Sequence, residues 1–352
     1  MIGSFRRWLI LLLLPVLAAG GCGWVPLRGP EAEVTLPQAP VVDRALAARI
    51  LALDPERISE AEVTQVLRRG PTPRVMLLHG GIFPVHLSMT SFGNFLVGMG
   101  YPEHKIRDPR SDDWSYSPYA DAERLAGIIA WFYEKDGMPP MLVGHSQGGM
   151  QAVKVLHVFA GAYAPEVPVW NPLTDFSEGR TTIRDPLMGK ERPVVGLTVD
   201  YVSAVGAGGA AFLLPNQWSL LGRLHSIPDT VHDFTGYVIG VDLWAWTLPG
   251  GDSRRFVNGG QAHVRNVTLP ASISHVLVPV TADLAADVVA RAWINGYHPG
   301  VAPAPLPPSA SDNMLWAADV WWSIKKYWTL EAQRLLRAPS NAVRSAVAGT
   351  VE

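Results

Sequence analysis

Short apolar runs recur through the middle of the chain and predict a series of buried strands. Each run is rich in aliphatic or β-branched residues, and most are too short for a helix. The runs are residues 74–78, 141–143, 194–205, 234–241 and 264–267. The first ends in the sequence His79-Gly80-Gly81.

Helix patterns alternate with these runs. The spacing i, i+3, i+4, i+7, which places apolar residues on one helix face, is shown by Leu125, Ile128, Ile129 and Phe132. Ser117 and Pro118 are suited to open this helix and Gly137 to close it. A second helix is expected over 151–159. The order strand, helix, strand, helix over residues 74–160 implies parallel strands joined by right-handed crossovers.

One segment, residues 139–150, contains the most informative motif of this strand and helix order. Its sequence is Pro-Pro-Met-Leu-Val-Gly-His-Ser-Gln-Gly-Gly-Met. An apolar run leads into Gly144-His-Ser146-Gln-Gly148, and a helix follows. Glycines two positions before and after a serine allow a strand-to-helix turn that side chains would obstruct. The serine then lies at the start of a helix, where free N–H groups favour a developing oxyanion. The alternative is a serine that only caps the helix.

This strand, turn and helix resembles the nucleophile elbow of the α/β-hydrolase superfamily, and within it the serine esterases and lipases. The resemblance covers roughly residues 74–297. It implies an α/β-hydrolase fold, with a mostly parallel central sheet, helices on both faces and a candidate cap insertion at 164–232. A helix that completes the core is the alternative for the cap. Ser146 would be the nucleophile.

The resemblance also suggests an oxyanion hole. In this family a His-Gly turn after a strand supplies one backbone N–H, and the residue after the nucleophile supplies another. Carried over, the donors are Gly81 or Ile82 together with Gln147. A plain turn at His79-Gly80-Gly81 is the alternative.

The resemblance places the catalytic base and acid in loops that follow the later strands. His275 lies in the expected loop, before a helix that Thr281 would cap. Asp242 directly follows the run 234–241, and the order serine, aspartate, histidine is that of the family. Asp252, in a glycine-rich turn, and Asp200 remain alternatives for the acid.

Charge, residue spacing and cysteine count argue against several kinds of partner and site. A formal net charge of −2 and the lack of a basic stripe argue against a nucleic-acid partner. No C-x-x-C or H-E-x-x-H spacing occurs, so no metal site is expected, and the proposed chemistry requires no cofactor. With one cysteine no internal disulfide can form, and a hydrophobic content of 48% allows a fold that depends on its core.

The N-terminus reads as an export signal over residues 1–22: Arg6-Arg7, an apolar run of about a dozen residues, then Ala19-Gly-Gly-Cys22. Cys22 lies where a bacterial lipoprotein is lipidated, although Ala19 replaces the usual leucine. Ordinary cleavage near Gly21 and an uncleaved anchor are alternatives. All three predict an exported protein, either a membrane-anchored lipoprotein of the bacterial cell envelope or a secreted one.

The remaining segments are a tether with lead-in helices (23–70), the hydrolase domain (71–300), a proline-rich linker (301–312) and a C-terminal amphipathic helix and tail (313–352). The last helix places Trp321 and Trp328 on one face and Asp319 and Lys326 on the other. Its tryptophans suit packing or a membrane interface, and we favour the surface-associated role because prolines separate it from the domain.

Together these features predict a serine hydrolase that cleaves a small-molecule or lipid carboxylic ester through an acyl-enzyme. A thioesterase, amidase or acyltransferase with the same triad is an alternative. A non-catalytic binding protein of the same fold is a further one, from a different functional class.

Overall fold

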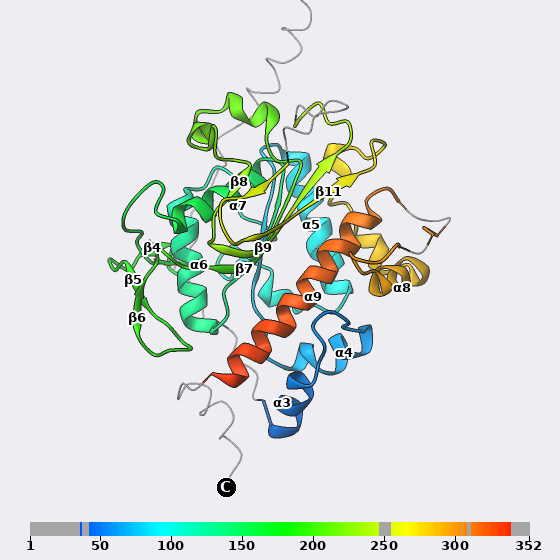
Figure 1. The fold of residues 1–352 in the computed structure, drawn as a ribbon, viewed down its shortest axis with the longest axis horizontal. Coiled ribbons are helices and arrows are strands. Elements are labelled where there is room, and N and C mark those ends of the chain that lie inside the picture. Colours follow the sequence, from blue (N-terminus) through cyan, green and yellow to red (C-terminus); the bar gives the residue numbers. More distant parts are fainter. Residues whose placement is uncertain (1–35, 37–41, 246–254, 304, 308–310, 339–352) are drawn as a thin grey trace, which may run out of the picture. The chain divides into compact units, whose positions relative to one another are not determined.

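Five parallel strands form the central sheet of the computed structural model, which describes residues 36, 42–245, 255–303, 305–307 and 311–338 (Figure 1). In order across the sheet the strands are β1 (Val75–Leu78), β2 (Met141–His145), β7 (Val199–Val205), β9 (Val231–Ile239) and β11 (His263–Leu269). Each strand pairs in parallel with the next. All the carboxyl ends therefore meet at one edge of the sheet.

Helices cover both faces of this sheet. They are α5 (Phe83–Gly98), α6 (Ala122–Asp136), α7 (Gln147–Phe159), α8 (Val288–Gly296) and α9 (Met314–Arg337). Alternate residues of β1 belong to different hydrophobic clusters: Val75 packs with α5 and α9, and Met76 with α6 and α7. The expected α/β class is confirmed, and the arrangement is consistent with an α/β-hydrolase fold.

Several element boundaries differ from those expected. Helix α6 begins after Asp121, whose carboxylate caps the N–H of Glu123, and not at Ser117. It ends as expected at Gly137, which has φ +74°. Helix α5 was not predicted. The helix expected after Thr281 is divided into a short 3-10 turn, η7 (Ala282–Ala285), and α8, which Asp287 caps.

Residues 164–232, predicted as a candidate cap, include the central strand β7. They are therefore not one continuous insertion. Before β7 lie two small antiparallel pairs, made by β3 (Trp170–Asn171) with β4 (Phe176–Ser177) and by β5 (Thr182–Arg184) with β6 (Glu191–Pro193). After it come the 3-10 turns η3 (Gly209–Leu213) and η4 (Pro215–Leu220) and the short strand β8 (Ser226–Ile227), which pairs with β10 (Val257–Asn258). A covering role for the parts that flank β7 stays a prediction.

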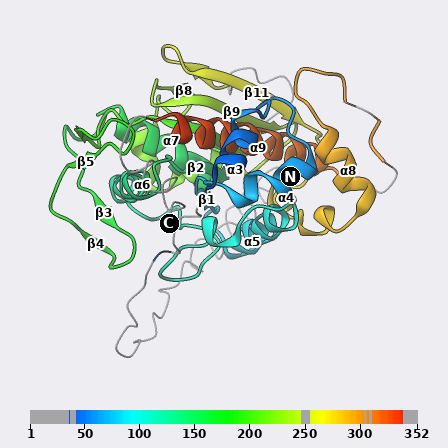
Figure 2. The same cartoon turned by 90° about the horizontal axis from the view of Figure 1, so that it is seen from below.

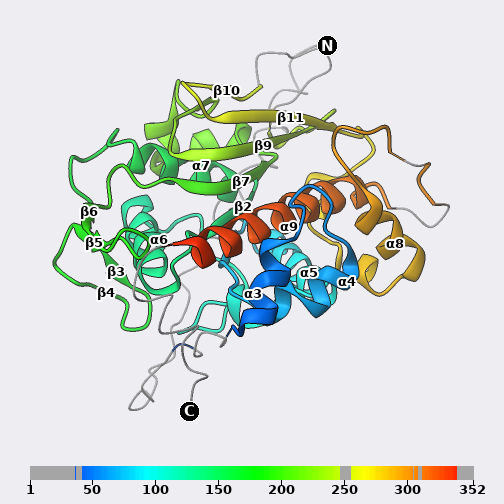
Figure 3. The same cartoon turned by 60° about the horizontal axis from the view of Figure 1, so that its bottom comes forward.

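The C-terminal helix α9 lies in the main hydrophobic core, which corrects the expected surface-associated role. Trp316, Trp321 and Trp328 have no exposed surface. Indole N–H groups of Trp321 and Trp328 donate to Asn295 Oδ1 and to the carbonyl of Pro71, each at 3.0 Å. Figure 3 shows α9 running across the sheet from α8 towards α6. These tryptophans are core residues and are not available to a membrane surface.

Asp319, expected on the polar face of α9, is also fully buried. Both of its oxygens lie 2.7 Å from the guanidinium of Arg265 on β11. A buried carboxylate is tolerated only with such a partner. The ion pair joins the helix to the edge strand of the sheet.

The lead-in helices α3 (Arg44–Leu51) and α4 (Glu60–Gln65) pack beside α9, followed by the 3-10 turn η1 (Leu67–Arg69) (Figure 2). Gln333 of α9 donates to the carbonyls of Ile50 and Leu53. A capping box between Ser59 and Glu62 starts α4. A further 3-10 turn, η2 (Glu103–Lys105), follows α5.

The predicted signal segment and Cys22 lie outside the described residues. Within the described part of the chain, no helix is long and apolar enough to cross a membrane.

Candidate active site

Ser146 occupies a strained turn between β2 and α7. Its backbone angles are φ +56° and ψ −124°. A positive φ is unfavourable for a residue with a side chain, and such strain of about 1–3 kcal/mol persists where the surrounding structure enforces it, often at functional sites. The N–H of Ser146 donates to the carbonyl of Val205 at 2.7 Å, which fixes the turn against β7.

The glycines of the motif are required by close backbone contacts. A Cβ on Gly144 would lie 2.5 Å from the carbonyl oxygen of Gly148, and one on Gly148 would lie 2.1 Å from the carbonyl oxygen of Leu78. Backbone atoms cannot move aside as the end of a side chain can. The prediction that side chains would obstruct this turn is therefore confirmed.

The loop that follows β1 lies beside Ser146. A Cβ on Gly80 would be 3.0 Å from the Cβ of Ser146, and one on Gly81 would be 2.1 Å from Oε1 of Gln147. The Tyr119 hydroxyl donates to the carbonyl of Gly81 at 2.8 Å. Two of the expected oxyanion-hole residues, Gly81 and Gln147, are thus neighbours, and Gln147 opens a helix, where N–H groups lack intrahelical acceptors. Their role as donors stays a prediction.

His275 and Asp242 form a buried pair at the same edge of the sheet. Nδ1 of His275 lies 2.6 Å from Oδ2 of Asp242, and their side chains are 6% and 1% exposed. The other carboxylate oxygen, Oδ1, accepts from the backbone N–H groups of Trp244 and Ala245 at 3.0 and 3.1 Å. The carboxylate is therefore held from both sides. Because Nδ1 donates to it, Nε2 of His275 is left as an acceptor.

The end of β7 brings the serine turn and the imidazole together. Val205 accepts the bond from the N–H of Ser146, and the next residue, Gly206, lies against the imidazole. Gly206 has φ +61°, and a Cβ there would lie 2.8 and 2.9 Å from Cε1 and Nδ1 of His275. Only glycine fits this position, both for its backbone angle and for its space.

The alternative acids lie elsewhere or outside the described residues. Asp200 is the second residue of β7, six residues before Gly206, which corresponds to about 20 Å along a strand. It is 6% exposed, and its carboxyl group interacts with that of Glu331 on α9, away from His275. Asp252 lies outside the described residues.

His145, which sequence reasoning did not single out, connects the two halves of the site. Its Nε2 lies 2.8 Å from the carbonyl oxygen of His275, and the centroids of the two rings are 4.9 Å apart. Burial, and then the neighbouring His275, hold the pKa of His145 well below its usual 6.5. His145 is consequently neutral near pH 7 and donates from Nε2. Its position next to the motif serine was the signal that could have indicated it.

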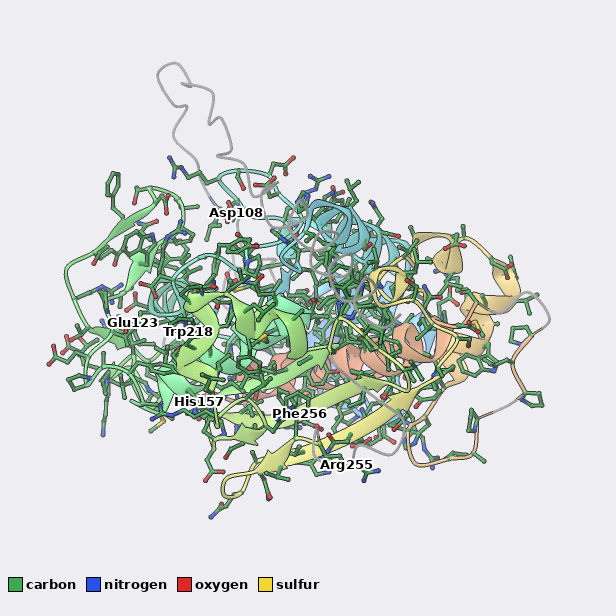
Figure 4. All side chains as sticks on the ribbon, turned by 90° about the horizontal axis from the view of Figure 1, so that it is seen from above. Asp108, Glu123, His157, Trp218, Arg255 and Phe256 are labelled. Atoms are coloured by element: carbon green, nitrogen blue, oxygen red, sulfur yellow. The ribbon has the colours of Figure 1, made fainter. Side chains whose placement is uncertain are left out.

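Exposed apolar side chains occur on the segments that carry the site. Leu243 and Trp244, beside Asp242, are 74% and 43% exposed, and Leu277, two residues after His275, is 54% exposed. Trp218, 56% exposed, lies outside these segments on the turn η4, which follows β7 (Figure 4).

Comparison with known proteins gives a distant match. No family model matches the chain. The chain is similar to esterase Rv0045c of Mycobacterium tuberculosis, with 26% identity over 148 residues. The match covers 40% of this chain and 46% of that esterase, so it spans less than half of the relative. This distant similarity and the parallel sheet are both consistent with an α/β-hydrolase fold.

Proposed function

We propose that the protein is a serine hydrolase of carboxylic esters, with Ser146 as nucleophile, His275 as general base and Asp242 as the acid that orients it. The observation that carries this proposal is the buried 2.6 Å contact between His275 and Asp242, at the sheet edge where Ser146 occupies its strained turn. Esterase similarity supports the same reaction class.

In this mechanism the Ser146 hydroxyl attacks the ester carbonyl carbon while Nε2 of His275 accepts its proton. Asp242 holds the Nδ1–H tautomer and stabilises the imidazolium that forms. The backbone N–H of Gln147, with that of Gly81 or Ile82, would stabilise the tetrahedral oxyanion, and such donors are each typically worth about 3 kcal/mol. His275 returns the proton to the leaving alcohol, and water then hydrolyses the acyl-enzyme by the same steps.

Three exposed apolar side chains close in sequence to the candidate catalytic residues support a substrate class. The exposed Leu243, Trp244 and Leu277 favour an ester with an apolar acyl or alkyl portion, including a lipid ester. A thioesterase, amidase or acyltransferase would use the same residues. A panel of matched esters, thioesters and anilides, with and without an added alcohol acceptor, separates these activities.

The test of the proposal is labelling with a fluorophosphonate, which reacts with activated serines. We expect the wild-type protein to be labelled at Ser146 and to hydrolyse p-nitrophenyl esters. Ser146→Ala should lose both properties while its thermal unfolding stays close to that of the wild type, because the glycines define the turn. The matched control Ser177→Ala, an exposed serine on β4, should keep both. A folded Ser146→Ala protein with full esterase activity would contradict the proposal, and absence of labelling would favour a binding protein.

We also propose that the protein is exported and lipidated at Cys22, so that its substrate would be met at the cell envelope. The support is the sequence of residues 1–22 alone: a basic start, an apolar run and small residues before the cysteine. A lipid anchor of this kind would hold the hydrolase near a membrane without a role for α9.

A further inference from the structure

A cavity of about 690 Å³ lies outside the candidate active site, where three distant parts of the chain meet. Its walls come from the loop before α4, from the end of α8 with the segment that follows it, and from α9. Figures 1 and 3 show these helices side by side. Ser146, Asp242 and His275 do not line it. Its volume is in the range of sites for small organic molecules.

The cavity wall contains a buried lysine, Lys325, that pairs with no carboxylate in the described part of the chain. Lys325 is 3% exposed, and its Nζ donates to the carbonyl of Ile58 at 2.8 Å. Burial lowers the pKa of Lys325 to about 8, and the charges of Glu60 and Glu62 offset this only in part. The ammonium has three donors, and within the described ranges one of them has an acceptor.

The neighbouring Lys326 shows what an ordinary lysine does in this helix. Its Nζ lies 2.9 Å from Oε1 of Glu56 and forms a conventional ion pair near the surface. Among the described residues no carboxylate pairs with Lys325 in this way. A buried cation that lacks such a partner is costly, and an anionic ligand would offset that cost.

The rest of the wall suits an apolar body. Trp293, Tyr297 and Trp322 contribute aromatic rings to the lining, and Val301 adds an aliphatic side chain. His298 packs edge-on against Trp322, with ring centroids 5.2 Å apart, and its Nδ1 is buried without a hydrogen-bond partner among the described residues.

We propose that this cavity binds an amphiphilic carboxylate, with its apolar chain against Trp293 and Trp322 and its carboxylate on Lys325. The ammonium of Lys325 can give its remaining donors to a carboxylate oxygen in a charge-assisted hydrogen bond. A phosphate monoester would bring more charge than these donors neutralise. The site does not depend on the chemistry of Ser146.

The experiment measures binding of octanoate and of octanol by calorimetry, with the full chain carrying Ser146→Ala so that no acyl transfer occurs. Octanol has the same chain without the charge. We expect saturable octanoate binding at one site and binding of octanol at least tenfold weaker, as a charge-assisted hydrogen bond predicts.

Two variants locate the site. Lys325→Met keeps the length and apolar stem of the side chain, and it should weaken octanoate binding at least tenfold while leaving octanol binding unchanged. Val301→Trp, at a residue that is 64% exposed in the wall, should block both ligands without altering Lys325. The matched control Lys154→Met, a lysine on α7 that does not line the cavity, should bind octanoate like its parent.

Four outcomes would overturn the proposal: no saturable octanoate binding, equal affinity for octanol and octanoate, or unchanged octanoate affinity in Val301→Trp or in a folded Lys325→Met protein. Thermal unfolding is recorded for each variant. If Lys325→Met fails to fold, the comparison of octanol with octanoate still tests whether the ligand's charge contributes to binding. Val301→Trp still tests whether the ligand binds in this cavity.

A second inference rests on a different observation, the contact between His145 and the backbone of His275, and it depends on the proposed function. We infer that His145 is a positioning residue for the catalytic base. Its Nε2–H donates to the carbonyl of His275 at 2.8 Å, while Nδ1 is buried and has no partner in the described chain. Within the described residues the His145 imidazole thus makes one hydrogen bond. This bond connects the loop of His275 to β2, the strand that leads to Ser146.

The test compares His145→Gln, whose amide N–H can replace Nε2–H, with His145→Leu, which cannot donate. We expect the leucine variant to lose at least tenfold in kcat with KM within about threefold, because a small displacement of a catalytic group is costly. The glutamine variant should recover most of that loss at equal thermal stability.

A purely structural role for His145 would lower the stability of both variants and leave kcat of the folded fraction unchanged. A folded His145→Leu protein with wild-type kcat would therefore refute the positioning role. Failure of the proposed function itself is distinguishable, since the wild-type protein would then show neither fluorophosphonate labelling nor ester hydrolysis.

Discussion

Glu331→Gln should stabilise the protein at neutral and alkaline pH. Glu331 on α9 is 2% exposed, and its carboxyl group interacts with that of Asp200 on β7, which is 6% exposed. Burial, and then the charge of Asp200, raise the pKa of Glu331 from 4.5 to about 9. Burial likewise raises the pKa of Asp200. Two carboxyl groups this close share a proton, and Glu331 holds it at pH 7.

The sign follows from proton binding in the two states. Below about pH 4.5 both states carry the proton, and above it the unfolded chain loses the proton while the folded chain keeps it. The free energy of unfolding therefore falls as pH rises from about 4.5 to about 9. Each pH unit costs about 1.4 kcal/mol, which amounts to about 3 kcal/mol at pH 7.

Glutamine imitates the protonated carboxyl group and can donate to Asp200 without binding a proton. The guanidinium of Arg334, whose side chain is 38% exposed, contacts Oε2 of Glu331 and can contact the amide oxygen of glutamine instead, so any loss here is about 0–1 kcal/mol. We expect a net gain of about 2–3 kcal/mol at pH 7 and little gain at pH 4.5.

Urea unfolding of both proteins at pH 4.5, 7 and 8.5 measures this difference. The matched control Glu166→Gln, at an exposed position, should change stability by less than about 0.5 kcal/mol at each pH. A Glu331→Gln protein that is less stable than the wild type at pH 8.5, or a difference that does not change with pH, would refute the reasoning.

The remaining predictions concern the site and the two ends of the chain. Asp242→Asn should lower kcat by up to about 10⁴-fold because it offers the wrong hydrogen-bonding pattern to the base, whereas Asp200→Asn should keep near-full activity; the opposite result would move the acid. Gly206→Ala should lower kcat at least tenfold, since its methyl would press on the imidazole, and wild-type kcat in the folded variant would contradict the geometry. Trp321→Ala should cost about 3–5 kcal/mol in urea unfolding and leave vesicle binding unchanged, and reduced vesicle binding without loss of stability would restore a surface role. Cys22→Ser should lose its fatty-acid label, and retained label would disprove lipidation at that residue.

Local sequence was sufficient to predict the centre of the fold. An apolar run, two glycines around a serine and a helix specify a sharp turn through backbone sterics alone, and the structure has that turn at Ser146. Strand positions were also predictable, because buried strands of a parallel sheet are short apolar runs in sequence. The positions of Asp242 and His275 after β9 and β11 were expected from the resemblance to the α/β-hydrolases, whose residue order they share.

What sequence could not determine was which surface covers each helix and each polar residue. The pattern of α9 indicates an apolar face, but it does not say whether lipid or the sheet lies against that face. Asp319 appeared to be a solvent-facing residue because its partner, Arg265, lies 54 positions away in the chain. Only the packing of α9 on β11 reveals that the pair is buried.

The same distinction applies to the site. The contact of Gly206 with His275, and the bond from His145 to the same loop, join strands that are neighbours only in the folded sheet. Neither residue type nor spacing encodes a contact between groups 130 positions apart. Local steric rules determined how the chain turns at Ser146, whereas long-range packing decided what surrounds it, because burial and partnership are properties of the assembled core.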